Sequence, residues 1–247
     1  MDDYSYLGSG KTLIREFGSA APFVEIGNCS AVTLSPQTNT LTLTDNTNPG
    51  GGTRNRVDRV TGVDLSYTFT DLHPDNLARA MRGTTLVLPA GSAVDEAVVG
   101  YKGGFVPLAN VATAVTSVEA TAGGTTYEEG DDYELRDGGL YIPEGSSIVD
   151  PVNGAANLSV SYAYGAASKV EALTVTQRNY EVLFLGLNEA RSGKAVRLHA
   201  HKVSGGVLQE LALIGDDFGS YQVTGSLLAD TSQPQGVSQY FSTVIVE

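Results

Sequence analysis

Residues 62–83 read GVDLSYTFTDLHPDNLARAMRG and carry the clearest structural signal in the chain. In the first half of this stretch, apolar and polar side chains alternate. The apolar set is Val63, Leu65, Tyr67 and Phe69, and the polar set is Asp64, Ser66, Thr68 and Thr70. A period of two residues predicts a β-strand with one buried face and one solvated face.

The second half of the stretch predicts a short helix. Pro74 suits the first helical position, Asp75 complements the positive end of the helix dipole, and Gly83 is a stop signal. At helical spacing, the side chains expected to face the core are Leu77, Ala80 and Met81.

Upstream, the sequence predicts strands followed by a long loop. In SAVTLSPQTNTLTLT (30–44), Val32 and Leu34, and then Leu41 and Leu43, occupy alternating positions, which is typical of a half-buried strand pair. DNTNPGGGTRNRVDR (45–59) has no period and is rich in Asn, Pro and Gly, so we expect a long mobile loop. A loop of this length in a compact domain is usually functional or disordered.

Downstream, residues 84–168 are more acidic and richer in glycine, with short segments such as TYEEGDDYEL and LSVSYAYG. They predict a small β subdomain inserted into a main domain made of residues 1–83 and 169–247. The main pattern resumes with an apolar run from Val182 to Leu187, which predicts a strand buried on both faces. With 29 glycines and no tryptophan, the whole chain favours an all-β fold.

Composition narrows the possible function. The 247 residues include 28 Asp and Glu against 15 Lys and Arg, and the formal charge of -13 disfavours tight binding to nucleic-acid phosphates. No segment approaches the roughly 20 apolar residues of a membrane span, and no signal peptide is visible, so we expect a protein that stays where it is made. Cys29, the only cysteine, is expected to be a small buried hydrophobe.

Catalytic and metal motifs are weak. LGSGKT (7–12) resembles a phosphate loop but has Ser5 where that loop needs glycine. His199 and His201 share a strand face with Arg197, and a solvated or interface-facing polar face is favoured over a metal site. EEGDDYELRDGG lacks calcium-loop spacing and predicts a solvated acidic turn. We therefore expect no enzyme, no cofactor and no metal.

Arg54, Arg56 and Arg59 stand out because they are close together in a chain with few basic residues. They could form a solvated loop tip. Alternatively, the loop of one copy could dock on the acidic body of the next copy, and such head-to-tail contacts close into rings or propagate as filaments.

The order of several motifs resembles the major tail tube proteins of long-tailed bacteriophages. The motifs are GSGK, PFVEIGNCSAVTLS, the Gly-rich loop, VDLSYTFTDLHPDNLARAMRG and IGDDFGSYQVTGSLLAD, and they cover about 1–83 and 169–247. The resemblance implies two packed β-sheets with one flanking helix, a fold shared with the tubes of contractile tails and type VI secretion. The insertion at 84–168 is similar to a small β subdomain on the outside of some tubes.

The resemblance also implies a function. Six subunits form a ring whose strands join into a barrel, and the rings stack into a hollow tube that delivers the genome. The inter-ring assembly loop would hold Asn48, Pro49, Gly50, Gly51, Gly52, Arg54, Arg56 and Arg59, and an N-terminal assembly arm would hold Gly8, Gly10 and Lys11. The polar strand face Asp64, Ser66, Thr68 and Thr70 is our candidate lumen face, because an acidic, hydroxyl-rich surface lets DNA slide.

The implied partners are other copies of the chain and the tape measure, tail tip and tail terminator proteins. Double-stranded DNA would pass through the lumen without specific binding, and no membrane is involved. The protein would be made in the host bacterial cytoplasm and end in the virion tail, which is expected to be non-contractile because the insertion would crowd a sheath. A competing hypothesis is an adhesin-like or virion-decorating β protein that binds a glycan or cell surface through 84–168. A hydrolase on a β scaffold is disfavoured because no acid, base and nucleophile converge.

Overall fold

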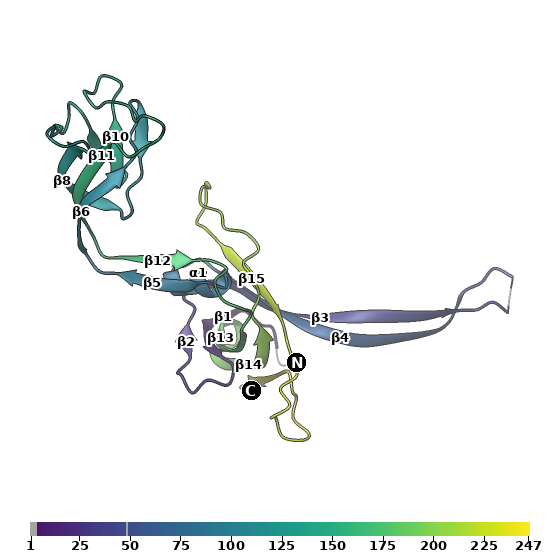
Figure 1. The fold of residues 1–247 in the computed structure, drawn as a ribbon. Helices are drawn as coiled ribbons and strands as arrows, with labels where there is room; N and C mark the ends of the chain where they lie inside the picture. The colour runs from purple at the N-terminus through teal and green to yellow at the C-terminus, as the bar shows by residue number, and fades with distance from the viewer. Residues whose placement is uncertain (1–3, 48) are drawn as a thin grey trace. The chain divides into compact units, whose positions relative to one another are not determined.

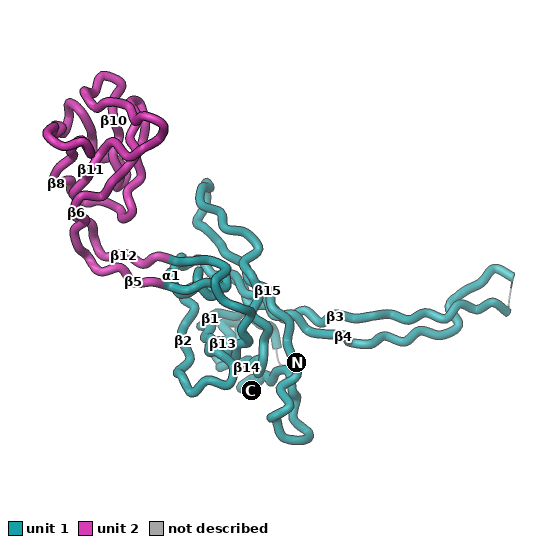
Figure 2. Tube along the Cα trace, in the orientation of Figure 1, with its two compact units in different colours: residues 1–85, 170–247 teal, residues 86–169 magenta. Residues whose placement is uncertain are grey.

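The structure is a computed structural model that describes residues 4–47 and 49–247. The chain divides into two compact units, unit 1 with residues 1–85 and 170–247 and unit 2 with residues 86–169 (Figure 2). Nearly all regular structure is antiparallel β, and the described residues contain one short α-helix. The predicted all-β class with a single short helix is confirmed. The bounds of unit 2, residues 86–169, nearly coincide with those of the expected insertion, residues 84–168.

The first sheet of unit 1 has five strands in the order β16-β14-β13-β1-β2 (Figure 1). Their bounds are β1 Gly8–Glu16, β2 Val24–Glu25, β13 Asn179–Asn188, β14 Lys194–Ser204 and β16 Phe241–Ile245. All neighbouring strands run antiparallel. A single 3-10 turn, η1 Glu189–Arg191, connects β13 to β14.

The second sheet of unit 1 has the order β15-β4-β3, with β3 at Cys29–Thr44, β4 at Thr53–Phe69 and β15 at Tyr221–Ser226. The predicted alternation along β4 is confirmed: Leu65, Tyr67 and Phe69 are buried, and the residues between them are partly exposed. Leu65 and Tyr67 form one core with Ile14 and Val182 of the first sheet. The two sheets are therefore packed on each other.

The predicted helix is α1, Pro74–Ala80, and it borders this core. His73 caps it by accepting a hydrogen bond at Nδ1 from the Asp75 N–H (3.3 Å). Ala80 is buried, and Leu77 and Met81 pack against the core as expected. The chain turns after the helix at Arg82, whose φ is 49°, in the left-handed region. The helix ends before Gly83, as expected, and the Gly83 N–H donates a hydrogen bond back to the Ala78 carbonyl (2.7 Å). A Cβ on Gly83 would also collide with the Glu171 carbonyl oxygen.

Two predictions for residues 30–59 are wrong. Residues 30–44 form one long strand with residue 29 instead of a strand pair, and β4 already begins at Thr53. The connection is therefore residues 45–52, and 53–59 belong to a strand. The two strands pair along their whole length, from Thr44 opposite Thr53 to Cys29 opposite Phe69. The hairpin therefore includes residues 53–59, which the sequence predicts as part of a loop.

The prediction that β13 is buried on both faces is also wrong. Val182 is buried in the core, whereas 42% of Leu185 and 49% of Leu187 are exposed. These leucines lie on the opposite face of β13 from the core residue Val182, so they point away from the second sheet. The outer face of the five-stranded sheet is therefore open and partly apolar.

Unit 2 has its own core between two small sheets, β6-β11-β8 and β7-β10-β9. The strand bounds are β6 Gly91–Val98, β7 Gly104–Val106, β8 Ala112–Ala120, β9 Glu134–Arg136, β10 Gly139–Ile142 and β11 Leu158–Tyr164. Leu140, Ile142 and Tyr162 are fully buried in this core. A separate two-stranded sheet, β5 Thr84–Leu88 and β12 Ala167–Glu171, carries the chain into and out of unit 2.

The prediction that the acidic turn of unit 2 is fully solvated is wrong for Asp132. Asp132 is 9% exposed, and its carboxylate accepts hydrogen bonds from the N–H groups of Glu128 (3.0 Å) and Ser147 (2.8 Å). These hydrogen bonds lower the pKa of Asp132, and the bond from the Glu128 N–H has the largest effect. Asp132 therefore holds the turn together, whereas Asp131 and Asp137 are exposed.

Candidate assembly surfaces

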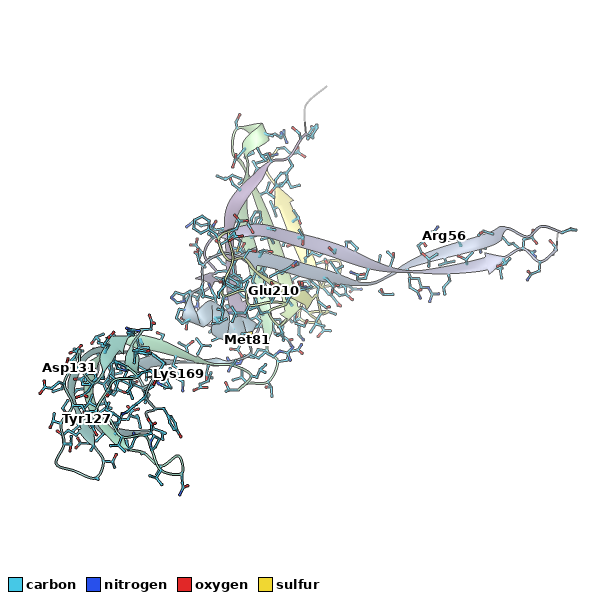
Figure 3. The ribbon with its side chains drawn as sticks, turned by 90° about the horizontal axis from the view of Figure 1, so that it is seen from above. Arg56, Met81, Tyr127, Asp131, Lys169 and Glu210 are labelled. Atoms are coloured by element: carbon cyan, nitrogen blue, oxygen red, sulfur yellow. The ribbon has the colours of Figure 1, made fainter. Side chains whose placement is uncertain are left out.

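The most prominent feature of unit 1 is the outer half of the β3–β4 hairpin, which we call the arm and define as residues 35–61. It projects from the two packed sheets in Figure 1, and Arg56 lies on it in Figure 3. The strand residues from Ser35 to Thr44 and from Thr53 to Thr61 are all exposed. Cross-strand hydrogen bonding builds the arm, with no burial behind it.

One face of the arm is apolar. Leu41 pairs directly with Val57, and Leu43 follows two residues along the same strand, so all three share a face. Their exposed fractions are 50%, 57% and 45% for Leu41, Leu43 and Val57. Three large aliphatic side chains on an exposed hairpin form a surface suited to covering by another protein.

The opposite face of the arm is polar and internally paired. The Thr40 hydroxyl donates a hydrogen bond to Asp58 (2.6 Å), and Arg56 Nε donates to the same carboxylate (3.0 Å). These two hydrogen bonds lower the pKa of Asp58, and the bond from Thr40 has the larger effect. The three arginines that the sequence groups together are thus separated. Arg56 is engaged by Asp58, and Arg59, which pairs with Asn39, lies on the Leu41 face.

Other members of the expected assembly loop occupy the tip of the arm. Arg54 is the extra residue at a bulge, because Leu43 pairs with Asn55 and Thr44 pairs with Thr53. Pro49, Gly50, Gly51 and Gly52 lie in the exposed turn. All three glycines have positive φ, which glycine adopts without strain. Asn48 lies outside the described residues.

The candidate lumen face lies on the second sheet, on the side away from the core. Asp64, Ser66 and Thr68 are half-buried and alternate with the core residues of β4, and Thr70 follows the end of the strand. The Ser226 hydroxyl of β15 donates a hydrogen bond to Asp64, and Gln37 Nε2 of β3 donates to the other oxygen of the same carboxylate (3.1 Å).

Strand β15 continues this polar face beyond the residues that we predicted. Gln222 Nε2 and the Thr224 hydroxyl both donate to Ser66 Oγ, at 2.8 Å and 3.2 Å. Asp64 is the one charged side chain among the described residues paired across the face. Sequence reasoning missed Gln222, Thr224 and Ser226. Their alternation in SYQVTGS was visible, but their position beside β4 depends on a register between distant strands.

The expected N-terminal arm is a strand of the five-stranded sheet instead. Gly8, Gly10 and Lys11 belong to β1 and pair with β13, so they are part of the folded domain, and their role in contacts between copies stays a prediction. A Cβ on Gly10 would lie 2.4 Å from the Leu185 carbonyl oxygen, which explains why glycine fits there. Lys11 Nζ lies 3.1 Å from Glu25 Oε2, an exposed ion pair between β1 and β2.

The histidines lie on the outer face of the same sheet, where one part of our expectation is wrong. His201 is 6% exposed instead of solvated, and its ring centre lies 4.7 Å from that of His199. His199 Nε2 is 3.5 Å from Glu181, which also pairs with Arg15 at 2.6 Å. Burial and then the neighbouring His201 lower the pKa of His199. In the part of the chain that the structure describes, no group of three or more His, Cys, Asp or Glu residues could hold a metal ion.

Cys29 was expected to be a small buried hydrophobe; it packs against the core of unit 1 but is only half-buried. Burial raises the pKa of its thiol. No helix within residues 4–47 and 49–247 has the length and apolar character needed to cross a membrane.

A family model described as "Protein of unknown function UCP028589" matches residues 5–244. The chain belongs to this family. The match includes the arm, both sheets of unit 1 and all of unit 2, so the family is defined over the whole architecture described above. A comparison with curated proteins gives no match.

Proposed function

We propose that the chain is a structural protein of a long-tailed bacteriophage that assembles into stacked six-subunit rings and forms the hollow tail tube. The observation that carries the proposal is the arm, a long exposed hairpin with an apolar face, which extends from a domain of two packed sheets. A lone molecule gains nothing from exposing such a surface, whereas stacked copies would cover it.

The sheet edges supply the contacts within a ring. In the second sheet of the described chain, β3 is an outer strand with one side free of any other strand. The outer side of β15 is partly covered, because Leu208 forms a bridge with Val223 and the Gln209 N–H donates a hydrogen bond to the Gln222 carbonyl (3.0 Å). Pairing an edge of one copy with an edge of the next continues the sheet, and closing the series into a ring leaves no free edge. Contacts of this head-to-tail kind form rings when the rotation closes.

The polar face of the second sheet suits the inner wall. Its hydroxyl and amide groups largely bond to one another, and its charged residue is the acidic Asp64. Such a wall offers DNA phosphates no cation, and the net charge of -13 adds repulsion at longer range. DNA would then move through the tube without binding to it.

In this proposal, unit 2 lies outside the tube, and the tape measure, tail tip and tail terminator proteins are the partners at the tube's interior and ends. The chain acts as a scaffold with no catalytic centre, and its final location is the virion tail after synthesis in the host cytoplasm.

Negative-stain electron microscopy of the purified chain, concentrated stepwise with light scattering in parallel, tests the proposal. Rings or hollow tubes are expected, with tail-tip complexes added as nuclei if the concentrated chain alone remains monomeric. A monomer that persists with those nuclei present and binds a glycan or cell surface would refute the proposal in favour of an adhesin-like or decorating protein.

A further inference from the structure

A second exposed surface of unit 1 is the loop between β14 and β15. Within it, residues 211–218 read LALIGDDF, and we call them the loop tip. Ile214 is 97% exposed, Phe218 is 98% exposed and Leu213 is 76% exposed. Asp216 and Asp217 are also exposed, and neither makes an ion pair within the described residues. The loop tip thus combines large apolar side chains with two free carboxylates.

Unit 1 also contains a cavity of about 480 Å³ whose character is the opposite. Its lining includes four of the chain's 15 basic residues, namely Arg15, Arg79, Arg82 and Arg178. Two carboxylates, Glu16 and Asp75, also line it, and Arg15 is paired with Glu181 at 2.6 Å, so the excess is one arginine. The remaining wall is partly apolar, with Ala21, Pro22, Val24, Ala78 and Val175. A cluster of four arginines in one cavity of a chain with a net charge of -13 favours an anionic occupant.

The arginines of the cavity are held in place and keep donor capacity. Arg82 donates from one terminal nitrogen to the Gly205 carbonyl (3.2 Å), while its buried Nε has no hydrogen-bond partner. Arg79 donates to the side chain of Asn76 (3.0 Å). Arg178 pairs with Glu16 at 3.2 Å, and about half of each side chain is exposed, so a stronger partner can compete. A guanidinium has five donors, and these contacts use few of them.

We infer that the loop tip of one copy docks into the arginine-lined cavity of a second copy. Phe218 and Ile214 fill the apolar part, and Asp216 and Asp217 bind the guanidinium groups of Arg82 and Arg178. The chain's own loop tip does not occupy its cavity, because Ile214 and Phe218 are almost fully exposed. The cavity volume lies within the roughly 300–1,000 Å³ typical of sites that enclose a ligand.

This contact joins two different surfaces of the same chain, so it is head-to-tail and can close a ring. The inference rests on the proposed function, and it names a contact within the ring that is separate from the arm. Carboxylates held by arginine give orientation as well as affinity, and buried aromatic anchors supply most of the binding energy at such contacts.

A peptide of residues 210–220, ELALIGDDFGS, isolates this contact from assembly. Fluorescence anisotropy of the labelled peptide is measured while the full-length D216N/D217N/F218S chain, whose own loop tip cannot compete for the cavity, is added up to about 1 mM. We expect saturable binding that weakens as salt is added, because exposed charge pairs are screened. The D216N/D217N/F218S peptide should bind at least about tenfold more weakly, because two charges and the aromatic anchor are removed.

On the protein side, Arg178→Gln should weaken binding of the wild-type peptide, and Arg191→Gln is the matched control. Arg191 lines a separate apolar groove with Tyr4 and Tyr6, and its guanidinium lies over the Tyr4 ring. Peptide variants cannot affect folding, so they keep the test decisive if a protein variant misfolds. Absence of saturable binding, equal binding of both peptides, or sensitivity to Arg191→Gln instead of Arg178→Gln would overturn the inference.

Electron microscopy of the full-length D216N/D217N/F218S chain separates failure of this inference from failure of the proposed function. Normal tubes from this variant would refute the docking contact and leave the tail tube proposal intact. If the peptide binds but the wild-type chain forms no rings or tubes, the docking contact is supported and the tail tube proposal is refuted.

Discussion

Removing the apolar face of the arm should prevent stacking while leaving the subunit folded. The variant is L41T/L43T/V57T, which places threonine, a residue with high β-propensity, at all three positions and removes the three aliphatic side chains on one face. About half of each side chain is exposed in the single subunit, and this exposed half is what a neighbouring ring could bury. Full burial of such a side chain contributes about 1.5–3 kcal/mol, so each one contributes about 1 kcal/mol to a ring contact.

Three such side chains give about 3 kcal/mol per contact, and about 1.4 kcal/mol corresponds to a tenfold change in an equilibrium constant. The concentration at which assemblies appear should therefore rise at least about a hundredfold. Sedimentation velocity and light scattering across a dilution series measure this threshold, and circular dichroism checks that the monomer remains folded.

Val60→Thr is the matched control, because Val60 is an exposed aliphatic residue of the same arm and pairs with Thr38 on the other face. It should leave the threshold unchanged. If L41T/L43T/V57T assembles at the wild-type concentration, the reasoning about the arm is refuted.

Three further predictions follow from the core, the histidine pair and the two units. Leu65→Ala should destabilise unit 1 by about 2–5 kcal/mol, because Leu65 is fully buried; calorimetry should show the unfolding transition of unit 2 unchanged, and a shift of both transitions would contradict separate cores. The lowered pKa of His199 means that the unfolded state takes up a proton more readily, so stability present above pH 6.5 should be lost as pH falls through 6.5 towards the lowered pKa. Urea unfolding of His199→Gln should show a smaller loss over that range, and a slope identical to wild type would refute this assignment. Replacing 86–169 with a short Gly-Ser linker should leave a unit 1 that folds and polymerises, whereas an insoluble product would show that it depends on unit 2.

Local patterns predicted the parts of the fold in which sequence neighbours share one environment. The alternation at Leu65 and Tyr67 decides which face of β4 is buried, and Pro74 followed by Asp75 marks where α1 begins. Both follow from short-range periodicity and capping chemistry. The acidic and glycine-rich composition also indicated the separate small β unit.

Predictions failed where long-range pairing overrides local preference. Residues 53–59 carry no periodic pattern, yet they continue a strand because β3 supplies a cross-strand partner for each step of the register. Leu185 and Leu187 read as buried, but their exposure depends on whether another layer covers that face of the sheet. His201 is buried by its tertiary surroundings, which its own segment does not reveal.

The candidate surfaces follow the same division. Asp64 and Ser66 were predicted from the sequence, whereas their β15 partners and the arginine-lined cavity were not. The cavity gathers Arg15, Arg82 and Arg178 from distant positions, and no spacing rule brings them together. Arg54, Arg56 and Arg59 are adjacent in sequence but divide between a bulge and two faces of the arm.

The most direct test of the central claim is a cryo-electron microscopy reconstruction of the assembly that the chain forms, nucleated with tail-tip complexes if required. The account predicts six subunits per ring around an open channel, with the polar face carrying Asp64 and Ser66 on the inner wall and the arm reaching the adjacent ring. An assembly without a channel, or a channel lined by another surface while this face packs between subunits, would contradict it.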